Sequence, residues 1–333
     1  MKQNNTTFKA FRVDEQDGNY SSSIKQMEFE ALKSNEVLVK VHYSSLNYKD
    51  ALSASGNKGV TRNYPHTPGI DAVGTIEKSN NDLFTIGEKV IVTSYDLGMN
   101  TDGGFAEYIQ IPYEWVVRLP EKMTMKEAMV YGTAGLTAGM SVLRLTELIK
   151  PDYGKIVVSG ATGGVGALSV SILSKLGYSV VAITGKATER DYLINLGAVE
   201  VLLRSEVENF SKKPLLKPLF AGAIDTVGGV ILENIIKSTA PIGVVTCCGN
   251  VASAKLDLTV FPFILRGVTL IGIDSQNYPM KYREVVWNKL AQEWKPEQLE
   301  STCYEIKLED IQEKIELMLQ GKLKGRTILT LAD

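Results

Sequence analysis

Alternating apolar and polar residues predict short strands in the first third of the chain. Between residues 36 and 46 the sequence EVLVKVHYSSL places valines on one face and polar residues such as Lys40 and His42 on the other. A period of two is typical of a half-buried strand. Similar runs separated by Gly, Asn and Asp predict further strands at 71–78, 87–95 and 104–111. Several short strands without long helices indicate a β-rich domain of barrel or sandwich type.

The pattern changes near Met125, where the apolar positions follow a helical spacing. The helix predicted over 125–148 contains a Gly-rich interruption, which is a candidate hinge. Beyond it, apolar strands alternate with helices, one of which is expected at 189–197 and is closed by Gly197. A series of this kind predicts a doubly wound parallel sheet with right-handed crossovers. The expected strands are 155–160, 179–184, 200–203, 222–227, 243–249 and 268–274.

The last part of the chain mixes both patterns, with a helix expected at 309–321 and a strand at 325–331. We expect that final strand to return to the first domain. The fold class is therefore α/β. The expected divisions are a β-rich domain over 1–125, a doubly wound nucleotide-binding domain over 126–275, and a returning segment over 276–333.

Composition narrows the class of protein. A chain of 333 residues with 44% hydrophobic and 22% charged residues favours about two globular domains. The net charge of −2 and the lack of a basic tract argue against nucleic-acid binding. Three cysteines are too few for a disulfide framework, and no signal peptide or membrane-spanning run is visible. We therefore expect a cytoplasmic protein that does not contact a membrane.

The metal-ligand residue types are also scarce. His42 and His66 are the only histidines, and the pair Cys247-Cys248 lies far along the chain from both. A structural zinc site takes four Cys or His ligands, and a catalytic site usually takes three ligands of His, Cys or acid type. Neither set is present at a recognisable spacing, so no metal is expected.

A glycine-rich stretch, VVSGATGGVG at 157–166, lies between a predicted buried strand and a predicted helix. It is a shifted version of the dinucleotide fingerprint, in which glycines allow a tight turn and a close approach of the backbone to a pyrophosphate. The alternative is a tight strand–helix connection without a ligand. The surrounding strand–helix units favour cofactor binding. The residues expected to contact the phosphates are Ser159, Gly160, Ala161, Thr162, Gly163, Gly164 and Val165.

The second strand of this series ends without the acidic residue that NAD-specific folds use to bind the ribose 2′-hydroxyl. Thr184, Gly185 and Lys186 stand there instead, with Arg190 one turn further on. A hydroxyl and a cation suit a 2′-phosphate, so NADPH is favoured over NADH. Arg204, after the third strand, is a candidate second clamp. The alternative for each cation is a solvated charge.

Short motifs are spread along nearly the whole chain: SSLNYKDAL (44–52), PGIDAVG (68–74), GGFAEY (103–108), GTAGLTA (132–138), SGATGGVGALSV (159–170), YLINLGA (192–198) and AIDTVGG (223–229). Together they resemble the medium-chain dehydrogenase/reductase superfamily. NYKDAL, FPFILR (261–266) and KGRTIL (324–329) resemble its zinc-free quinone oxidoreductase branch, in the YhdH/YhfP-type group that includes acrylyl-CoA reductase. The resemblance implies a GroES-like catalytic domain split by a Rossmann domain, with NADPH in the cleft between them.

The same resemblance shows where zinc ligands would fall. The ligand His and Glu of the zinc-dependent branch correspond to Ile70 and Asp71, and its Cys-containing motif corresponds to Ser45–Asp50. The cysteine-rich lobe of that branch is also missing, since 93–103 contains no cysteine. Asp71 is therefore expected to be a structural hydrogen-bond acceptor.

The resemblance places Asn47, Tyr48 and Asp50 beside the nicotinamide. Tyr48 is expected to pack on the cofactor, orient it or donate a proton, and the alternative is an aromatic that fills the cleft wall. Asn47 is a candidate amide donor to the substrate oxygen, and Asp50 is expected to hold the loop in shape. Arg326 is expected to contact a ligand, with a surface ion pair as the alternative. Further cofactor contacts are expected from Thr133, Cys248, Gly249, Asp274 and Ser275.

These features predict an NADPH-dependent oxidoreductase that works without a metal. Its substrate would be a small molecule with a conjugated C=C, namely an enone, a quinone or a short enoyl-CoA such as acryloyl-CoA. Two alternatives stay open: an NADPH-binding sensor or structural protein, and a zinc-dependent alcohol dehydrogenase. The resemblance also suggests a homodimer formed by antiparallel pairing of the edge strand 268–274.

Overall fold

The computed structural model describes residues 7–210 and 212–331, which divide into two compact units. Among these residues the first unit contains 7–133, 276–291 and 298–331, and the second contains the remainder of 134–275 together with 292–297. The chain thus passes from the first unit to the second after Thr133 and returns at Gln276. The domain limits expected from the sequence, 1–125, 126–275 and 276–333, remain a prediction, because these compact units are defined by contacts rather than as domains. The two units are described one at a time.

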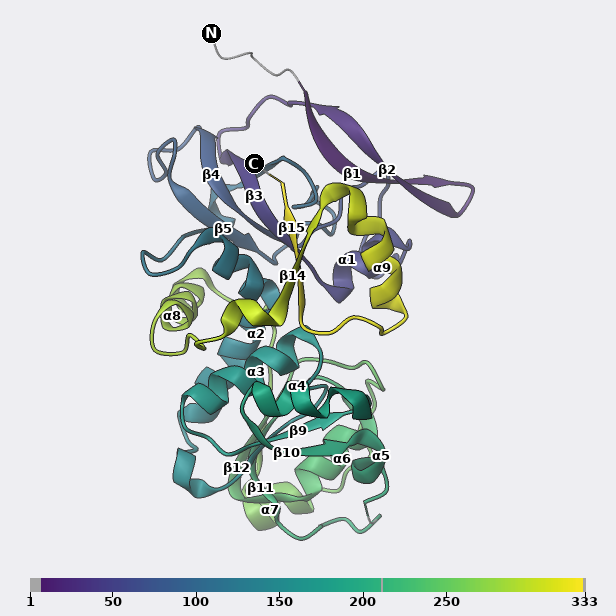
Figure 1. The fold of residues 1–333 in the computed structure, drawn as a ribbon, viewed down its shortest axis with the longest axis vertical. Coiled ribbons are helices and arrows are strands. Elements are labelled where there is room, and N and C mark those ends of the chain that lie inside the picture. The colour runs from purple at the N-terminus through teal and green to yellow at the C-terminus, as the bar shows by residue number, and fades with distance from the viewer. Residues whose placement is uncertain (1–6, 211, 332–333) are drawn as a thin grey trace. The chain divides into compact units, whose positions relative to one another are not determined.

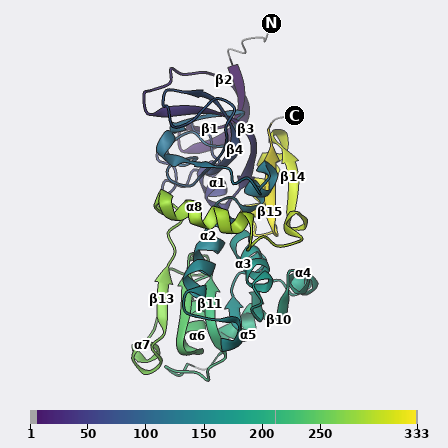
Figure 2. The same ribbon diagram turned by 90° about the vertical axis from the view of Figure 1, so that its left-hand side faces the viewer.

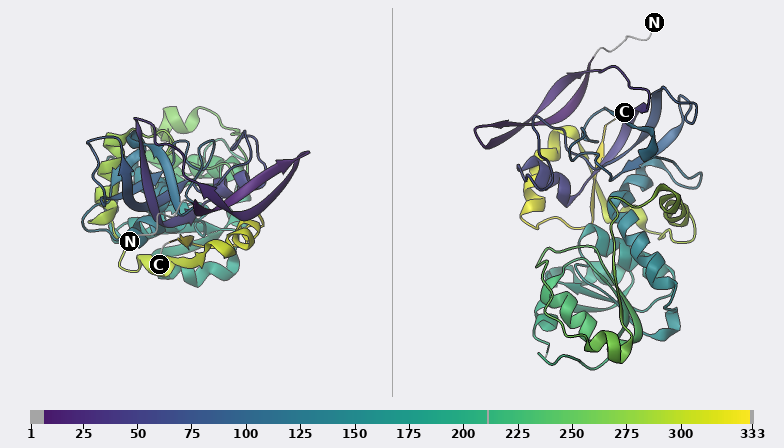
Figure 3. Two further views of the ribbon diagram at one scale, coloured as in Figure 1. Left: turned by 90° about the horizontal axis from the view of Figure 1, so that it is seen from above. Right: turned by 180° about the vertical axis from the view of Figure 1, so that it is seen from behind.

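The first unit begins with an antiparallel hairpin of β1 (Thr7–Gln16) and β2 (Asn19–Glu28). Its turn holds Asp17 at φ +53° and Gly18 at φ +77°, the left-handed pair that a two-residue hairpin turn requires. The purple hairpin projects from the rest of its unit in the left-hand view of Figure 3. The sequence pattern did not predict it, although Asp-Gly is the strongest short-range hairpin signal.

A mixed sheet forms the body of the first unit. Its strands run in the order β14-β15-β3-β4-β5-β7, and β6 pairs with β3 off this path. The strands expected at 36–46 and 71–78 are confirmed. The one expected at 87–95 is confirmed over Lys89–Thr93, and the one expected from 104 starts only at Tyr108. The bounds are β3 (Glu36–Leu46), β4 (Asp71–Ser79), β5 (Lys89–Thr93), β6 (Tyr108–Pro112), β7 (Val116–Arg118), β14 (Cys303–Lys307) and β15 (Arg326–Thr330).

The return of the chain to this sheet is also confirmed. β15 pairs antiparallel with β3, and β14 pairs parallel with β15. The first unit also holds α1 (Tyr48–Ala54), α8 (Met280–Ala291) and α9 (Ile311–Leu319), of which α1 and α9 pack side by side (Figure 1). Its 3₁₀ turns are η1 (Tyr113–Trp115), η4 (Leu299–Thr302) and η5 (Leu308–Asp310).

The second unit is built on six parallel strands in the order β10-β9-β8-β11-β12-β13, as the apolar series predicts. This is the order of a Rossmann fold, in which the chain moves outwards from β8 first to one side and then, from β11, to the other. β13 forms one edge (Figure 2). The bounds are β8 (Ile156–Val158), β9 (Val180–Thr184), β10 (Ala198–Leu203), β11 (Phe220–Asp225), β12 (Thr239–Cys247) and β13 (Thr269–Gly272).

Helices connect these strands on both faces. α3 packs on β8–β11 and α6 on β11 and β12. Because the strand order reverses direction at β8, right-handed crossovers put α3 and α6 on opposite faces. The helices are α2 (Met125–Thr146), which continues from the first unit, α3 (Gly164–Lys175), α4 (Arg190–Asn195), α5 (Arg204–Glu208), α6 (Gly229–Lys237) and α7 (Phe261–Arg266), with η2 (Pro151–Tyr153) and η3 (Ala187–Glu189).

Each unit has its own apolar core. In the second unit the core joins strand residues such as Val157 and Val245 to helix residues such as Ile231 and Ile235. In the first unit the inward face of β3, with Val37, Val39 and Val41, packs on β4, β5 and β6. Among the described residues, no helix is long and apolar enough to cross a membrane.

Candidate active site

Asp50 lies at the start of α1 and holds the loop before that helix in shape. Its carboxylate accepts the backbone N–H groups of Asn47 at 2.7 Å, Gly69 at 3.1 Å and Ile70 at 2.8 Å. The side chain is fully buried. Burial, together with the nearby Asp71 carboxylate, raises the pKa of Asp50 to about 7, against the lowering effect of its backbone donors. Asp50 thus ties the 47–50 loop to the Pro-Gly turn before β4.

Asp71 is the acceptor at the centre of a buried hydrogen-bond network. It lies at the start of β4 and is completely buried. Its Oδ2 accepts Ser45 Oγ at 2.6 Å and Asn47 Nδ2 at 2.7 Å. Its Oδ1 accepts the Thr133 hydroxyl at 2.6 Å, and the Thr133 N–H also lies 2.9 Å from it. The expected structural acceptor role of Asp71 is confirmed.

Arg326 completes this network from β15. Its Nη2 lies 3.6 Å from Asp71 Oδ2 and donates to Ser45 Oγ at 2.7 Å. Nη1 donates to Asn47 Oδ1 at 3.0 Å, and Nε to the carbonyl oxygen of Val130 at 3.0 Å. The side chain is buried, so the alternative of a surface ion pair is wrong. Burial lowers the pKa of the guanidinium, while Asp71 and Asp50 favour its charged form.

Gly132 lets the long helix α2 pack closely against Asp71 and Arg326. The residue interrupts the helix with φ +50° and ψ −153°, which is the break that the Gly-rich interruption indicates. A Cβ at this position would lie 2.3 Å from Asp71 Oδ2, 2.6 Å from Ser45 Oγ and 2.9 Å from Arg326 Nη2. Only glycine fits both the backbone conformation and the space.

The residues expected to act on the substrate differ in their availability. Both N–H groups of the Asn47 amide are engaged, one with Asp71 Oδ2 and the other with the Ser45 carbonyl at 3.1 Å. Tyr48, the first residue of α1, is 50% exposed, and its hydroxyl makes no hydrogen bond to the described part of the chain. Tyr48 is therefore the aromatic side chain of this loop that remains available to a ligand.

The glycine-rich loop of the second unit has the geometry of a phosphate cradle. It joins β8 to the N-terminus of α3, where backbone N–H groups favour an anion. Gly160 takes φ +59°, and a Cβ there would lie 2.2 Å from Thr226 Oγ1. A Cβ at Gly166 would lie 2.3 Å from the Gly160 carbonyl oxygen, so the helix approaches the loop closely. Ser159 is buried and bonds Asp225 at 2.6 Å, beneath the loop.

The three basic residues considered for a 2′-phosphate, Lys186, Arg190 and Arg204, differ in their position relative to the end of β9. The Thr184 hydroxyl accepts the Lys186 N–H at 3.0 Å, and a Cβ at Gly185 would lie 3.4 Å from Arg204 Cζ. The guanidinium of Arg204 therefore lies over the strand tip. Arg190 instead donates to the carbonyl oxygen of Val201 at 3.2 Å, which turns it toward β10. Lys186 and Arg204 are the cations that flank the strand tip.

The other predicted cofactor residues follow the carboxyl ends of β12 and β13. Cys248 donates its N–H to the Asp225 carbonyl, and a Cβ at Gly249 would lie 2.1 Å from the Thr226 carbonyl oxygen. Ser275 accepts a hydrogen bond from Thr137 at 2.8 Å, one residue after Asp274. The carboxyl ends of parallel strands share one edge of a sheet. The predicted residues of the second unit therefore gather on the edge where α/β folds bind ligands.

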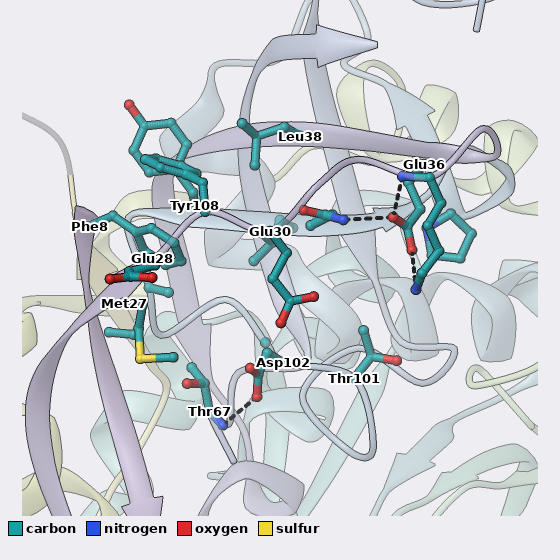
Figure 4. A pocket seen from close by; sticks show the side chains of 18 of the residues that line it. Phe8, Met27, Glu28, Glu30, Glu36, Leu38, Thr67, Thr101, Asp102 and Tyr108 are labelled. Atoms are coloured by element: carbon teal, nitrogen blue, oxygen red, sulfur yellow. Dashed lines mark hydrogen bonds and ion pairs between the residues drawn. The ribbon is translucent and has the colours of Figure 1, made fainter. Parts of the chain in front are cut away.

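The first unit also contains a cavity of about 340 Å³, shown in Figure 4. Phe8, Phe29 and Tyr108 pack together on its wall, and Asp102 lies on the other side. Although burial opposes it, hydrogen bonds from His66 and Arg12 lower the pKa of Asp102 to about 2. None of the predicted catalytic or cofactor residues lines this cavity.

Comparison with known proteins matches both parts of the chain to families. Residues 33–121 match the alcohol dehydrogenase GroES-like domain, and residues 164–292 match the zinc-binding dehydrogenase family. The putative quinone oxidoreductase YhfP of Bacillus subtilis is 43% identical over 98% of this chain and 99% of its own. The acrylyl-CoA reductase AcuI of Ruegeria pomeroyi is 37% identical over 95% of this chain and 96% of its own.

The chain belongs to the medium-chain dehydrogenase/reductase family.

Solved structures agree with the quinone oxidoreductase type of this family. The Bacillus subtilis yhfP structure with NAD bound has a TM-score of 0.95 and covers 98% of this chain and 100% of its own. The Salmonella enterica yhdH oxidoreductase in complex with NADP has a TM-score of 0.94 at 38% identity, covering 97% of this chain and 100% of its own. This medium-chain dehydrogenase/reductase is therefore an oxidoreductase with a GroES-like domain and a Rossmann domain.

The family matched by residues 164–292 is named for zinc binding, so we asked whether this chain has residues placed to bind zinc. Over residues 7–210 and 212–331, no group of three or more His, Cys, Asp and Glu is placed to hold a metal. At the two positions matched to zinc ligands, Ile70 is buried and Asp71 is occupied by protein donors.

Sequence reasoning missed several members of the network. Ser45, Ser94 and Gly132 each contact the Asp71 group, yet none was a candidate. Ser45 lies within the motif SSLNYKDAL and Gly132 within GTAGLTA, so the motifs held the signal. Ser94 lies in no motif, and only its position after β5 reveals it.

Gly132→Ala is expected to destabilise the protein more than a matched glycine substitution. At Gly87, with φ +87° and no atom within 4 Å of a Cβ, alanine costs only the left-handed conformation, about 1–2 kcal/mol. At Gly132 crowding against Asp71 adds about 1–3 kcal/mol. Urea unfolding measures both free energies, and equal losses would contradict this account of Gly132.

Proposed function

We propose that this medium-chain dehydrogenase/reductase is an NADPH-dependent reductase of activated C=C bonds, acting on an enone, a quinone or a short enoyl-CoA such as acryloyl-CoA. The observation that carries the proposal is the Asp71–Arg326 pair, whose atoms lie 3.6 Å apart at a position matched to a zinc ligand. Protein donors satisfy the carboxylate there, and the loop beside it presents Tyr48. The names of YhfP and AcuI support the substrate classes of quinone and acrylyl-CoA.

NADPH is the cofactor, and the second unit fits it. Glycine at 160 and 166 lets the loop pack closely on α3, whose N-terminal backbone N–H groups suit a pyrophosphate. One related structure holds NAD and another NADP, and we assign the choice between the two forms to the tip of β9. Lys186 and Arg204 supply positive charge where NAD-specific folds carry an acid.

Lys186→Ala and Arg204→Ala are each expected to raise the Kd for NADPH about tenfold or more and to leave the Kd for NADH nearly unchanged. A charged hydrogen bond to a phosphate contributes about 1.5–3 kcal/mol, and NADH has no 2′-phosphate. Fluorescence titration measures both constants. Lys155→Ala is the control, because its ammonium group pairs with Glu200 at 2.6 Å. Equal losses for both cofactors would rule out the 2′-phosphate role.

The first unit supplies what the reduction needs besides the hydride. When bound, NADPH delivers hydride to the β-carbon of the conjugated C=C. Negative charge then develops on the substrate oxygen, where hydrogen-bond donors stabilise it, and the α-carbon takes up a proton from water. The Asn47 amide has no free N–H for this purpose. We therefore assign the hydrogen bond that stabilises the substrate oxygen to the Tyr48 hydroxyl.

The test is an NADPH-oxidation screen with acryloyl-CoA, 1,4-quinones and short enones, compared by kcat/KM. Tyr48→Phe is expected to lower kcat by about 100-fold, the lower end of the cost of removing one hydrogen-bond donor to a developing oxyanion, with little change in KM. Tyr153→Phe is the control, since Tyr153 is an exposed tyrosine of η2 in the second unit.

The outcomes separate the alternatives. Unchanged kcat in Tyr48→Phe would leave Tyr48 a packing role only. Tight NADPH binding with no oxidation in the presence of any acceptor would favour a sensor or structural protein. Stoichiometric zinc in the purified protein, with activity on alcohols, would favour an alcohol dehydrogenase.

We further propose a homodimer formed at the edge of the second unit's sheet. β13 is the edge strand, and α7, the next helix along the chain before it, exposes Phe261, Ile264 and Leu265. Exposed apolar residues beside an open strand edge are typical of a pairing surface. Antiparallel pairing of β13 with its copy across a two-fold axis would cover both.

Ile264→Glu combined with Leu265→Glu is expected to convert the dimer to a monomer, because two charges would be buried at the interface. Sedimentation velocity measures the mass in solution. Ile86→Glu, at an equally exposed position of the first unit, is the control and is expected to leave the dimer intact. A wild-type monomer at micromolar concentration would contradict the proposal.

A further inference from the structure

Two consecutive residues after β5 have a left-handed backbone conformation, which residues other than glycine rarely adopt. Ser94 has φ +63° and Tyr95 has φ +50°, and neither is glycine. Such residues persist only where the surrounding structure fixes them, and they cluster at functional sites. The contacts that fix this turn lie within the first unit.

The ring of Tyr95 contacts two neighbours. The Trp115 ring stacks on it, with centroids 5.7 Å apart and planes 14° from parallel. The guanidinium carbon of Arg283 lies 4.1 Å from the centroid of the same ring. The Tyr95 N–H donates to the Gln276 carbonyl oxygen at 3.1 Å. An arginine against an aromatic face adds a cation–π attraction.

Arg283 is buried on α8 and ties this turn to the segment that precedes the helix. Its Nη1 donates to the Thr93 carbonyl oxygen at 3.0 Å, at the end of β5. Nη2 donates to the Gln276 carbonyl oxygen at 2.8 Å, and Nε to that of Tyr278 at 2.7 Å. A planar guanidinium with fixed donors suits this task, whereas the three donors of a lysine share one nitrogen and cannot reach three separated carbonyl oxygens as well.

Ser94 links this turn to the buried hydrogen-bond network around Asp71. Its N–H donates to the Ile70 carbonyl oxygen at 2.8 Å, and its Oγ lies 2.9 Å from Thr133 Oγ1. Thr133 uses its one hydroxyl proton on Asp71 Oδ1 at 2.6 Å. Ser94 must therefore donate to Thr133 in this arrangement. A continuous set of contacts thus runs from Arg283 through the turn to Asp71.

We propose that Arg283 is a positioning residue for the reduction: by holding Ser94 and Tyr95 in the left-handed conformation, it fixes the Thr133 hydroxyl on Asp71 and so the loop that carries Tyr48. This inference rests on the proposed reductase function. Arg283 itself does not touch the substrate in this account. Thr133 and Gln276, the residues at which the chain leaves and re-enters the first unit, are both bound by this turn.

The experiment is a double-mutant cycle on the full-length enzyme with Arg283→Met, Ser94→Ala and both together. Each single change is expected to lower kcat about five- to tenfold, the effect of one misplaced hydrogen bond, while the Kd for NADPH stays within about twofold. If Arg283 acts through Ser94, the double variant is no more than about twofold slower than the slower single variant. If the fold reductions in kcat of the two single variants multiply in the double variant, the proposal is overturned.

Controls separate positioning from a general loss of stability. Arg266→Met removes another guanidinium that donates to backbone carbonyls, including those of Lys237 and Thr239, in the second unit. It is expected to lower Tm without lowering kcat. Arg283→Lys keeps the charge and is expected to recover less than half of the kcat that Arg283→Met loses. Where Arg283→Met does not fold, Arg283→Lys replaces it in the cycle.

A readout independent of turnover distinguishes failure of this inference from failure of the proposed function. The Thr133 N–H is bound to Asp71, so its hydrogen exchange reports the network directly. Exchange at Thr133 is expected to quicken in Arg283→Met and in Ser94→Ala, but not in Arg266→Met. Unchanged exchange would overturn the inference even if the wild type reduces no substrate. A wild type that oxidises no NADPH would count against the proposed function alone.

Discussion

The buried carboxylate of Asp71 is the group on which the first unit's arrangement depends. A charge removed from water is costly unless an opposite charge and hydrogen bonds compensate it. Asp71 obtains these from Arg326, Ser45, Asn47 and Thr133. The donors come from β15, the end of β3, the loop before α1 and the long helix α2. A shift of any one segment removes one of the partners of this buried carboxylate, so the network favours one arrangement of all four segments.

The network has a chemical consequence at its surface. It uses both N–H groups of the Asn47 amide, and the Asp50 carboxylate is occupied by backbone donors. Tyr48 is left exposed at the start of α1, where its neighbours Asn47 and Asp50 are fixed. Preorganised donors stabilise developing charge because they need no rearrangement during the reaction. The predicted cofactor residues of the second unit form a separate group along one edge of its sheet.

Much of the fold followed from periodicity, and the misses have physical reasons. The parallel series was predictable because buried strands read as continuous apolar runs between Gly-rich turns. Helix α8 escaped because its buried stripe, Arg283, Val286, Trp287 and Leu290, begins with a charged residue. The β1–β2 hairpin escaped because its strands are largely polar, although Asp17-Gly18 marks the turn. The final strand was predictable, and its pairing with β3 confirms the expected return.

The sequence by itself determined the two kinds of fold, the glycine-rich loop after β8 and the absence of an acid at the tip of β9. These are local properties, because strand period and turn glycines act within a few residues. Only the tertiary structure decided that Arg326 is buried and bound to Ser45, which lies 281 positions away, and that the Asn47 amide is occupied. Burial determines which polar groups must find protein partners, and it emerges only when distant segments pack together.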